Sequence, residues 1–215
     1  MSLSWGSLPQ KFLDEVTRIM QELEIYDKGV HDHCVRVSHM SRFLAEAMQL
    51  SSYDQLVAQF AGLLHDAGKM KTPLNIVNKP SKLTDEEYDV IRRHPIASAE
   101  LLEPLEKSSF FREVQVAVLH HHERVDGLGY PFGLSGEQIP FISRLILVVD
   151  TVDAMTETRP YRKGLPVEVA YQELIKFSGK QFDSELVKVF IAAHRKTEME
   201  QMAPNVLQFP IKKAA

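Results

Sequence analysis

The sequence predicts an all-α fold, and three observations carry this prediction. Apolar residues recur at helical spacing along most of the chain, as Phe12, Val16, Ile19 and Leu23 do near its start. Helix-start signals stand between such stretches, among them Ser51 before a long apolar run. No stretch alternates apolar and polar residues convincingly enough to indicate a strand, and there is no internal repeat or low-complexity tract.

The first two helices are expected over residues 8–26 and 27–50. In the second helix His33 falls on the apolar face, so we expect this imidazole to point inward. His31 and His39 fall on polar faces and are interpreted as solvated. A lone inward histidine is more often a satisfied core residue than a metal ligand, so His33 needs partners elsewhere in the chain.

A third helix, capped by Ser51, ends in the stretch A-G-L-L-H-D-A-G-K at residues 61–69. His65 and Asp66 offer ligand atoms for a divalent metal, and the two oxygens of Asp66 suit a bridge between two metals. Lys69 follows Asp66 by three positions, so on a helical path it overhangs the same surface and suits a bound phosphate. Alone this is a weak signal, because His-Asp pairs arise by chance.

The middle of the chain contains a further candidate ligand at a helix junction. Residues 70–80 include two prolines and are expected to form a loop. Thr84 and Glu87 have capping-box spacing, which predicts a helix after them. Pro95 disfavours a helical backbone at the preceding His94 and allows a new helix to begin. A side chain at such a junction can be aimed into a site, although a kink with a solvated histidine is an equal alternative.

Three successive histidines close the next predicted helix, at residues 110–122. Because they span most of a helix circumference, at most two of them easily serve one site. Residues 125–140 are rich in glycine and proline and predict a long loop. A loop of this length in a compact domain favours a functional role.

A carboxylate and a basic cluster lie in the last third of the chain. Pro140 begins an apolar helix in which Asp150 directly follows an apolar run, so its charge needs a cationic partner, either an arginine or a metal. Residues 159–163, R-P-Y-R-K, concentrate positive charge suited to phosphate. Two further helices are expected over residues 166–177 and 183–194.

Composition bounds the class of protein. The 215 residues are 44% hydrophobic and 25% charged, with a formal net charge of -4, which is typical of a globular protein and does not favour long nucleic acid as a partner. The single Cys34 excludes an internal disulfide framework and a cysteine-based zinc site. With no visible signal peptide, we expect a cytoplasmic setting. The most apolar run, residues 141–155, carries charges and is too short for a membrane segment.

The candidate ligands consist only of imidazoles and carboxylates, a donor set that suits iron, manganese or zinc and disfavours a magnesium-only cage. Seven donors are too many for one tetrahedral ion and suit two ions that share Asp66. A two-metal site can hold a bridging hydroxide and clamp the oxygens of a phosphoryl displacement. The candidates are His33, His65, Asp66, His94, His121, His122 and Asp150.

An ordered set of motifs extends from about His33 to about Asp183. The set reads H-C-V-R-V, H-D-A-G-K, N-K-P-S-K-L-T, R-R-H-P, H-H-E-R-V-D-G-L-G-Y-P, D-T-V-D-A-M-T, R-P-Y-R and Q-F-D. In this order the chain closely resembles the HD-GYP family, a subgroup of the HD-domain metal-dependent phosphohydrolases. The resemblance implies an HD-domain helical bundle with a GYP-containing loop and additional C-terminal helices.

The resemblance also implies a bacterial phosphodiesterase that hydrolyses cyclic di-GMP to linear pGpG, GMP or both, through a hydroxide that bridges two divalent ions, most typically iron or manganese. Some family members have a glutamate four residues before the first histidine that supports a third metal, but this chain has Gly29 there, so two metals are expected. The implied roles are a first metal on His33, His65, Asp66 and Asp150, a second on Asp66, His94, His121 and His122, catalytic roles for Asp66 and Lys69, and ligand binding by Lys69, Tyr130, Arg159 and Arg162.

The expected domain organisation is an N-terminal helix at 1–28, acting as a linker or dimerisation helix, a catalytic domain at 29–196 and a tail at 197–215. Cyclic di-GMP is the expected partner, with a homodimer and a regulatory or GGDEF-type protein as further expectations. Two alternatives stay open: hydrolysis of another cyclic nucleotide, and a non-catalytic role as a cyclic-dinucleotide receptor or protein-interaction adaptor.

Overall fold

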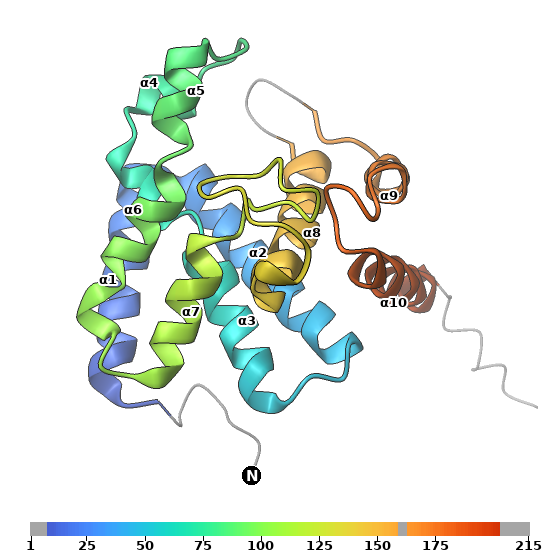
Figure 1. The fold of residues 1–215 in the computed structure, drawn as a ribbon, viewed down its shortest axis with the longest axis horizontal. Coiled ribbons are helices and arrows are strands. Elements are labelled where there is room, and N and C mark those ends of the chain that lie inside the picture. The colour runs from blue at the N-terminus through green and yellow to red at the C-terminus, as the bar shows by residue number, and fades with distance from the viewer. Residues whose placement is uncertain (1–7, 159–162, 203–215) are drawn as a thin grey trace, which may run out of the picture.

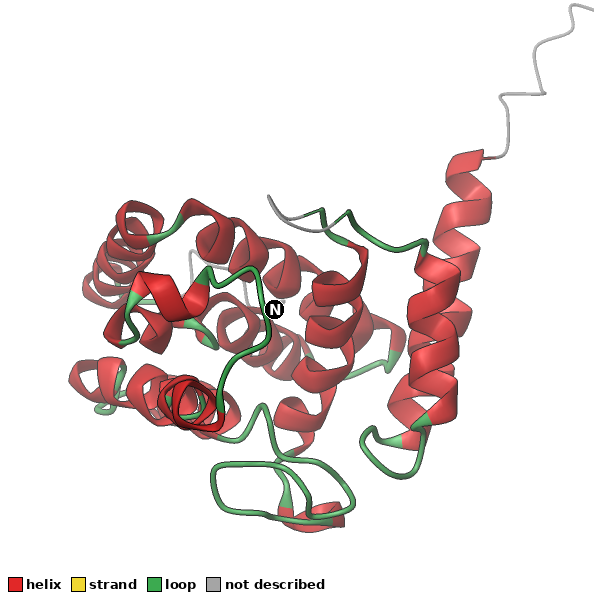
Figure 2. Cartoon of the chain, turned by 90° about the horizontal axis from the view of Figure 1, so that it is seen from above, coloured by secondary structure: helices red, strands yellow, loops and turns green. Residues whose placement is uncertain are grey.

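The computed structural model describes residues 8–158 and 163–202. Within these residues the chain is helical and contains no β-strand, as Figure 2 shows. The only strand-like pairings there are two isolated bridges, Asp126 with Ser135 and Ser178 with Phe182. The predicted all-α fold is confirmed.

The longest connection within the described residues is the loop between α7 and α8, which contains η4 (Figure 1). In chain order the helices are α1 (Gln10–Tyr26), α2 (Lys28–Ala47), α3 (Ser52–Leu64), the 3-10 helix η2 (Ala67–Lys71), α4 (Leu74–Val77), α5 (Asp85–Ile91), α6 (His94–Leu101), η3 (Glu103–Leu105), α7 (Ser109–Leu119), η4 (Gly136–Gln138), α8 (Phe141–Thr156), α9 (Val167–Lys176) and α10 (Ser184–Met202).

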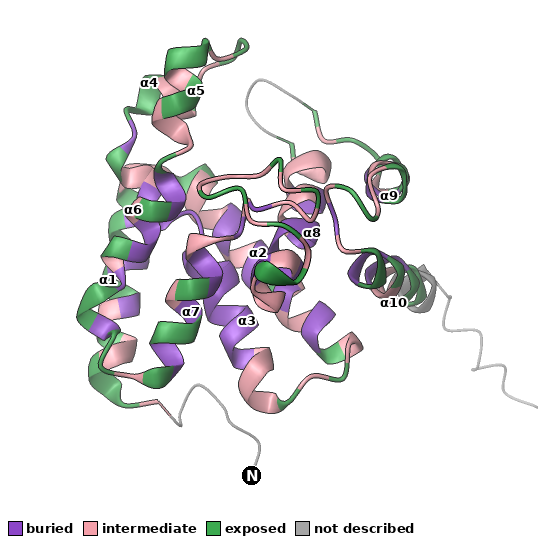
Figure 3. Cartoon of the chain, in the orientation of Figure 1, coloured by how far each residue is buried: buried purple, intermediate pink, exposed green. Residues whose placement is uncertain are grey.

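Helix α3 lies at the centre of the bundle, in contact with α2, α7 and α8. Every residue from 56 to 64 is buried, and Figure 3 shows α3 in the buried colour beyond its first turn, which has the intermediate colour. A helix that is apolar around its whole circumference must be enclosed by others. Each fully buried leucine or phenylalanine on it contributes about 1.5–3 kcal/mol of burial free energy, so the end of α3 at His65 is held in a rigid surrounding.

Helix α1 belongs to the same core. Its residues Val16, Ile19 and Leu23 are buried in the cluster that also contains the α2 and α3 side chains, and the helix packs on α2 and η2. Helices α9 and α10 cover α8 on the opposite side of the molecule, at the right of Figure 1.

Helices α4 and α5 form an arm that extends from the bundle, at the top of Figure 1. Neither helix contains a buried residue. The expected capping box is present, since Thr84 accepts from the backbone of Glu87 and the Glu87 side chain accepts from the backbone of Thr84. Nδ2 of Asn78 donates to Asp27 over 2.6 Å and ties the arm to the start of α2.

Three local predictions need correction. Residues 70–80, expected as a loop, contain α4, a single helical turn for which Pro73 is the N-cap residue. Helix α7 ends at Leu119, whereas the predicted helix extended through His122. The histidines therefore follow the helix, and the limit that a helix circumference places on them does not apply. Helix α6 begins at His94 itself, with Pro95 in its first turn.

Among the described residues, no helix combines the length and apolar character needed to cross a lipid bilayer.

Candidate metal centre

The fold brings all seven predicted metal ligands together from separate elements. Their ligand atoms form two overlapping sets of donors. We call His33, His65, Asp66 and Asp150 the first donor group, and Asp66, His94, His121 and His122 the second donor group. Within the second donor group, all donor atoms lie within 4.8 Å of one another. The same limit holds separately among His33, His65 and Asp66 of the first donor group. Nε2 of His33 is 3.1 Å from Oδ1 of Asp150, which joins that residue to the first group.

Asp66 belongs to both groups, and each of its oxygens faces one of them. Oδ2 lies 3.5 Å from Nε2 of His33 and 3.4 Å from Nε2 of His65. Oδ1 lies 3.1 Å from Nε2 of His94. A carboxylate with its two oxygens directed at separate sets of donors has the geometry of a bridging ligand.

Hydrogen bonds to carbonyl groups determine which nitrogen of three imidazoles carries the proton. Nδ1 of His65 lies 2.8 Å from the carbonyl oxygen of Gly62. Nδ1 of His94 lies 2.6 Å from the carbonyl oxygen of Ile91, and Nδ1 of His121 lies 2.6 Å from that of Val118. A carbonyl oxygen only accepts, so Nδ1 must donate. In the neutral rings Nε2 therefore presents a lone pair to the centre, as metal-ligating histidines do.

His33 is oriented by side chains instead. Its Nδ1 donates to Oδ2 of Asp153 over 2.6 Å. Asp153 is buried and accepts two further hydrogen bonds from Arg36, at 2.7 and 3.0 Å. A carboxylate behind the far nitrogen fixes the ring and increases the basicity of the nitrogen that faces the centre.

The protonation states also differ between the groups. Burial lowers the pKa of His65 and of His121, and the neighbouring imidazoles lower that of His121 further. Burial and His94 lower the pKa of His122 to about 3. His33 differs: burial lowers its pKa, but hydrogen bonds to Asp150 and Asp153 outweigh this and raise it to about 9. Apart from His33, these imidazoles are neutral at pH 7, as metal binding requires.

The two carboxylates of the centre are ionised. Burial raises the pKa of Asp66, but Lys69 and His65 lower it well below the usual value. The pKa of Asp150 is likewise lowered, because His33 outweighs the effect of burial. The predicted alternative partner of Asp150, an arginine, does not pair with it among the described residues. Its printed ion-pair distances are instead to imidazoles: Oδ1 of Asp150 lies 3.1 Å from Nε2 of His33 and 3.9 Å from Nε2 of His65.

The donor set fits divalent metal ions. Nε2 of His65 and Oδ1 of Asp66 are buried and make no hydrogen bond to any described residue. Nε2 of His94 lies 3.2 Å from Nε2 of His121 and 3.1 Å from Nε2 of His122. Lone pairs that converge at these distances repel one another unless a cation lies between them, and an unsatisfied buried polar atom is costly.

A close backbone contact joins the two groups. Gly68 packs directly on the first turn of α6, where a methyl group would overlap the carbonyl oxygen of His94 and the backbone nitrogen of Ser98. The Ser98 hydroxyl accepts from the Gly68 nitrogen over 2.7 Å and donates to the His65 carbonyl over 2.7 Å. The absence of a side chain at Gly68 thus allows His94 to lie beside Asp66.

Lys69, the predicted phosphate-facing residue, lies at the centre. Its Nζ is 2.5 Å from Oδ2 of Asp66, and this carboxylate raises the pKa of Lys69 although burial lowers it. The ammonium group is therefore charged and adjacent to the shared carboxylate.

The glycine-rich loop closes over the second donor group. Glu123 is buried and accepts from the backbone nitrogens of Phe132 and Leu134, at 2.7 and 3.0 Å. Gly129 packs against the backbone of residues 122–124, where a methyl group would not fit. These contacts place the ring of Tyr130 in a stack on His122, with centroids 4.7 Å apart and planes inclined by 28°.

A pocket of about 390 Å³ opens beside this loop, with His122 and Asp150 in its wall. Tyr130, which is predicted to bind the ligand, lines this pocket together with Arg92. The other two predicted ligand-binding residues, Arg159 and Arg162, lie outside the described residues.

The other His-Asp pair of the chain is separate from the centre. His39 is exposed as expected, whereas His31 is half-buried, with Nδ1 2.9 Å from Asp32. Sequence reasoning missed Asp153 and Glu123 as supporting residues. The sequence offered one signal for Glu123, which directly follows the histidine run, but none for Asp153, which is 120 positions from its histidine.

Comparisons with known proteins agree with this fold and donor set. A family model for the HD domain matches residues 17–186. A cyclic di-GMP phosphodiesterase of Pseudomonas aeruginosa is 43% identical over 173 residues, which cover 80% of this chain and 41% of that protein. A 3′3′-cGAMP-specific phosphodiesterase of Vibrio cholerae is 36% identical over 160 residues, which cover 74% of this chain and 36% of that protein.

Among solved structures, the HD domain of the L. monocytogenes phosphodiesterase PgpH, in complex with cyclic-di-AMP, superposes with a TM-score of 0.60 at 17% identity. The match covers 89% of this chain and 100% of that one, and it supports the fold alone. The chain spans about half or less of the length of the curated relatives it matches.

Proposed function

This chain belongs to the HD domain family, and from that premise we propose that it is a metal-dependent phosphodiesterase that hydrolyses cyclic di-GMP to linear pGpG, GMP or both. The observation that carries the proposal is the shared carboxylate of Asp66, which presents one oxygen to each of two donor groups. Paired donor groups of this kind suit the displacement of an oxygen at phosphorus.

In this proposal the first donor group holds one divalent ion and the second donor group holds another, with Asp66 in both. When bound, the ions supply an activated water and offset the charge of the phosphate. The imidazole-rich donors, mixed with carboxylates, favour iron or manganese. Gly29 supplies no side chain, which supports two ions and not three.

The chain's own residues position the reacting groups. Lys69 places a positive charge beside Asp66, where negative charge develops on the phosphoryl oxygens as the bond to phosphorus forms. Tyr130, held over His122 by the loop, covers the second donor group and narrows access for water. Arg159 and Arg162 are proposed as ligand-binding residues on the strength of the sequence resemblance.

The substrate assignment is supported by the 43% identical relative from Pseudomonas aeruginosa, which is a cyclic di-GMP phosphodiesterase. The cyclic GMP-AMP-specific relative keeps another cyclic dinucleotide as the second candidate substrate. We further propose a cytoplasmic setting, supported by the single free thiol of Cys34, which is buried. The homodimer, the regulatory or GGDEF-type partner and the domain bounds 1–28, 29–196 and 197–215 stay predictions.

The test is metal analysis of protein purified without oxygen, combined with product analysis on cyclic di-GMP in the presence of iron or manganese. We expect two ions per chain and release of pGpG or GMP. Tight binding of the nucleotide without turnover under either metal would favour the receptor alternative and overturn the proposal.

A further inference from the structure

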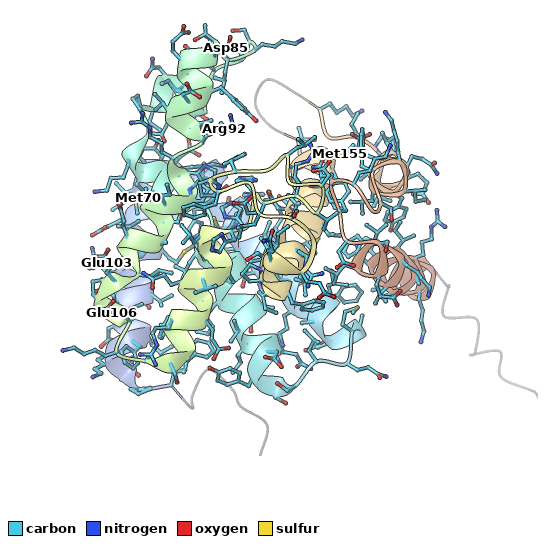
Figure 4. All side chains as sticks on the ribbon, viewed as in Figure 1. Met70, Asp85, Arg92, Glu103, Glu106 and Met155 are labelled. Atoms are coloured by element: carbon cyan, nitrogen blue, oxygen red, sulfur yellow. The ribbon has the colours of Figure 1, made fainter. Side chains whose placement is uncertain are left out.

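The pocket beside the second donor group has walls from three parts of the chain. Helix α5 contributes Tyr88, the residue that caps its C-terminus is Arg92, the glycine-rich loop contributes Tyr130, and α8 contributes Leu147 and Met155. Figure 4 shows Arg92 at the inner end of the arm and Met155 on α8, with the loop between them. Because His122 and Asp150 of the two donor groups stand in the same wall, the pocket adjoins the candidate metal centre.

A continuous column of planar groups leads from the metal centre into the pocket. The ring of Tyr130 stacks on His122. The guanidinium carbon of Arg92 lies 4.9 Å from the centroid of Tyr130 and 5.2 Å from that of Tyr88. Cation–π contacts with two rings restrict the guanidinium, so Arg92 is held in place before any ligand arrives.

The guanidinium N–H donors of Arg92 are not used within the described part of the chain, where its backbone nitrogen donates to the carbonyl oxygen of Tyr88. No carboxylate or carbonyl there accepts from its guanidinium. Arg124, the other arginine in the pocket, is engaged by Asp126 through two hydrogen bonds of 3.0 and 2.6 Å. Of the two, only Arg92 therefore offers a fork of free N–H donors to a ligand.

The remaining walls favour a flat organic ring over a second phosphate. Leu147, Met155 and the exposed Leu128 provide apolar surface on the pocket, and the exposed ring of Tyr88 provides an aromatic face. Nucleobases bind between such side chains by stacking, whereas a phosphate requires several donors at one point.

We propose that this pocket receives a guanine base of the substrate and that Arg92 reads its O6–N7 edge, so that Arg92 determines base specificity. The proposal rests on the proposed function. Guanine presents two acceptors on this edge, which match the paired donors of an arginine, whereas adenine presents one acceptor and one donor. An adenine in the same place would direct the donor N–H groups of its amino group at the donor N–H groups of Arg92.

The test compares Arg92→Ala and Arg92→Lys with Arg93→Ala, a matched control on the neighbouring exposed arginine, which does not line the pocket. Steady-state kinetics are measured on cyclic di-GMP and cyclic di-AMP. We expect Arg92→Ala to lose about 10- to 100-fold in kcat/KM on cyclic di-GMP, mainly through KM, and much less on cyclic di-AMP. Arg92→Lys should recover only part of the preference, since an ammonium group lacks the fork, and Arg93→Ala should match wild type.

Equal losses of kcat/KM on both substrates would indicate that Arg92 binds a phosphate, and this result would overturn the proposal. If Arg92→Ala keeps the wild-type preference for cyclic di-GMP, the proposal is also overturned. Calorimetric binding of GMP and AMP to the same proteins separates this inference from the proposed function. If wild type hydrolyses neither dinucleotide, the proposed function fails. In that case the inference of a guanine pocket is supported only if Arg92→Ala weakens the binding of GMP and not that of AMP. It is contradicted if the binding of both nucleotides stays as in wild type. Unchanged thermal unfolding of the variants shows that the fold is intact.

Discussion

The two donor groups of the centre share Asp66 but are built differently. The first donor group comes from α2, from the turn directly after α3 and from α8, and it adds the carboxylate of Asp150 to two imidazoles. The second donor group has three imidazoles, contributed by the start of α6 and by the segment after α7. The first is therefore richer in negative charge and the second in neutral nitrogen donors.

The groups also differ in what orients their ligands. In the second donor group, backbone carbonyls hold His94 and His121, so no side-chain substitution removes these contacts. In the first, His33 depends on the side chains of Asp153 and Arg36. The first donor group can therefore be altered through the side chains of Asp153 and Arg36 behind His33, whereas the second can be altered through the loop that covers it.

The largest effect is expected from Asp66→Ala, because this residue alone belongs to both groups. We expect loss of both metals and of activity, well beyond the roughly 10–100-fold cost of losing a residue that only orients a ligand. Metal content by elemental analysis and hydrolysis of cyclic di-GMP are the measurements. Asp89→Ala, which removes an exposed carboxylate on α5, is the control. A variant that keeps two metals and full activity would rule out the bridging role.

A smaller effect, confined to the first donor group, is expected from Asp153→Asn. The amide cannot accept from His33 and Arg36 as strongly as the carboxylate does, so affinity for one of the two ions should fall about 10- to 100-fold. Metal titration monitors this loss. Asp32→Asn removes the carboxylate from the other His-Asp pair on α2 and should leave both affinities unchanged. Equal weakening of both ions by Asp153→Asn would contradict the independence of the groups.

The loop over the second donor group is tested by Glu123→Gln. The amide nitrogen would face a backbone N–H that Glu123 now satisfies, and an unpaired buried donor costs about 1–3 kcal/mol. We expect KM for cyclic di-GMP to rise about tenfold, with both metals retained. Glu137→Gln, an exposed position in the same loop, is the control. If Glu123→Gln loses metal and keeps the wild-type KM, Glu123 positions the metal-binding side chains and does not act through the loop.

The smallest effect is a difference in pH dependence between the two ions. The pKa of His33 is raised to about 9 from its ordinary value of 6.5. In the metal-free protein its proton is stabilising below pH 6.5, and this stabilisation is lost as the pH rises through about 9. Metal binding must expel that proton, so affinity of the first donor group should rise about tenfold per pH unit between these values.

The pKa values of His121 and His122 are lowered, so the second donor group should bind with little dependence on pH in that range. Calorimetry in buffers of different ionisation enthalpy counts the protons released with each ion. The same dependence of affinity on pH for both ions would contradict the proposed difference. Asp153→Asn should reduce the number of protons released when the ion of the first donor group binds.

Local sequence determined the helices, because helical periodicity, the Ser51 cap and the Thr84 capping box act within a few residues of one another. Local sequence also determined the list of candidate ligands, because these imidazoles and carboxylates stand in motifs that follow one another in a specific order. The end of α7 was less predictable: His120 leaves the helical backbone, with φ -110° and ψ 12°, although no glycine or proline stands among residues 120–125.

Tertiary structure decided which of these side chains meet and what supports them. Asp153 reaches His33 across 120 positions because α8 packs on α2, and no spacing rule connects residues so far apart. Arg92 lies between Tyr88 and Tyr130 only because the arm and the loop fold toward each other. Composition and periodicity act along the chain, whereas the choice of partner for a buried charge or ring depends on which helix faces pack together.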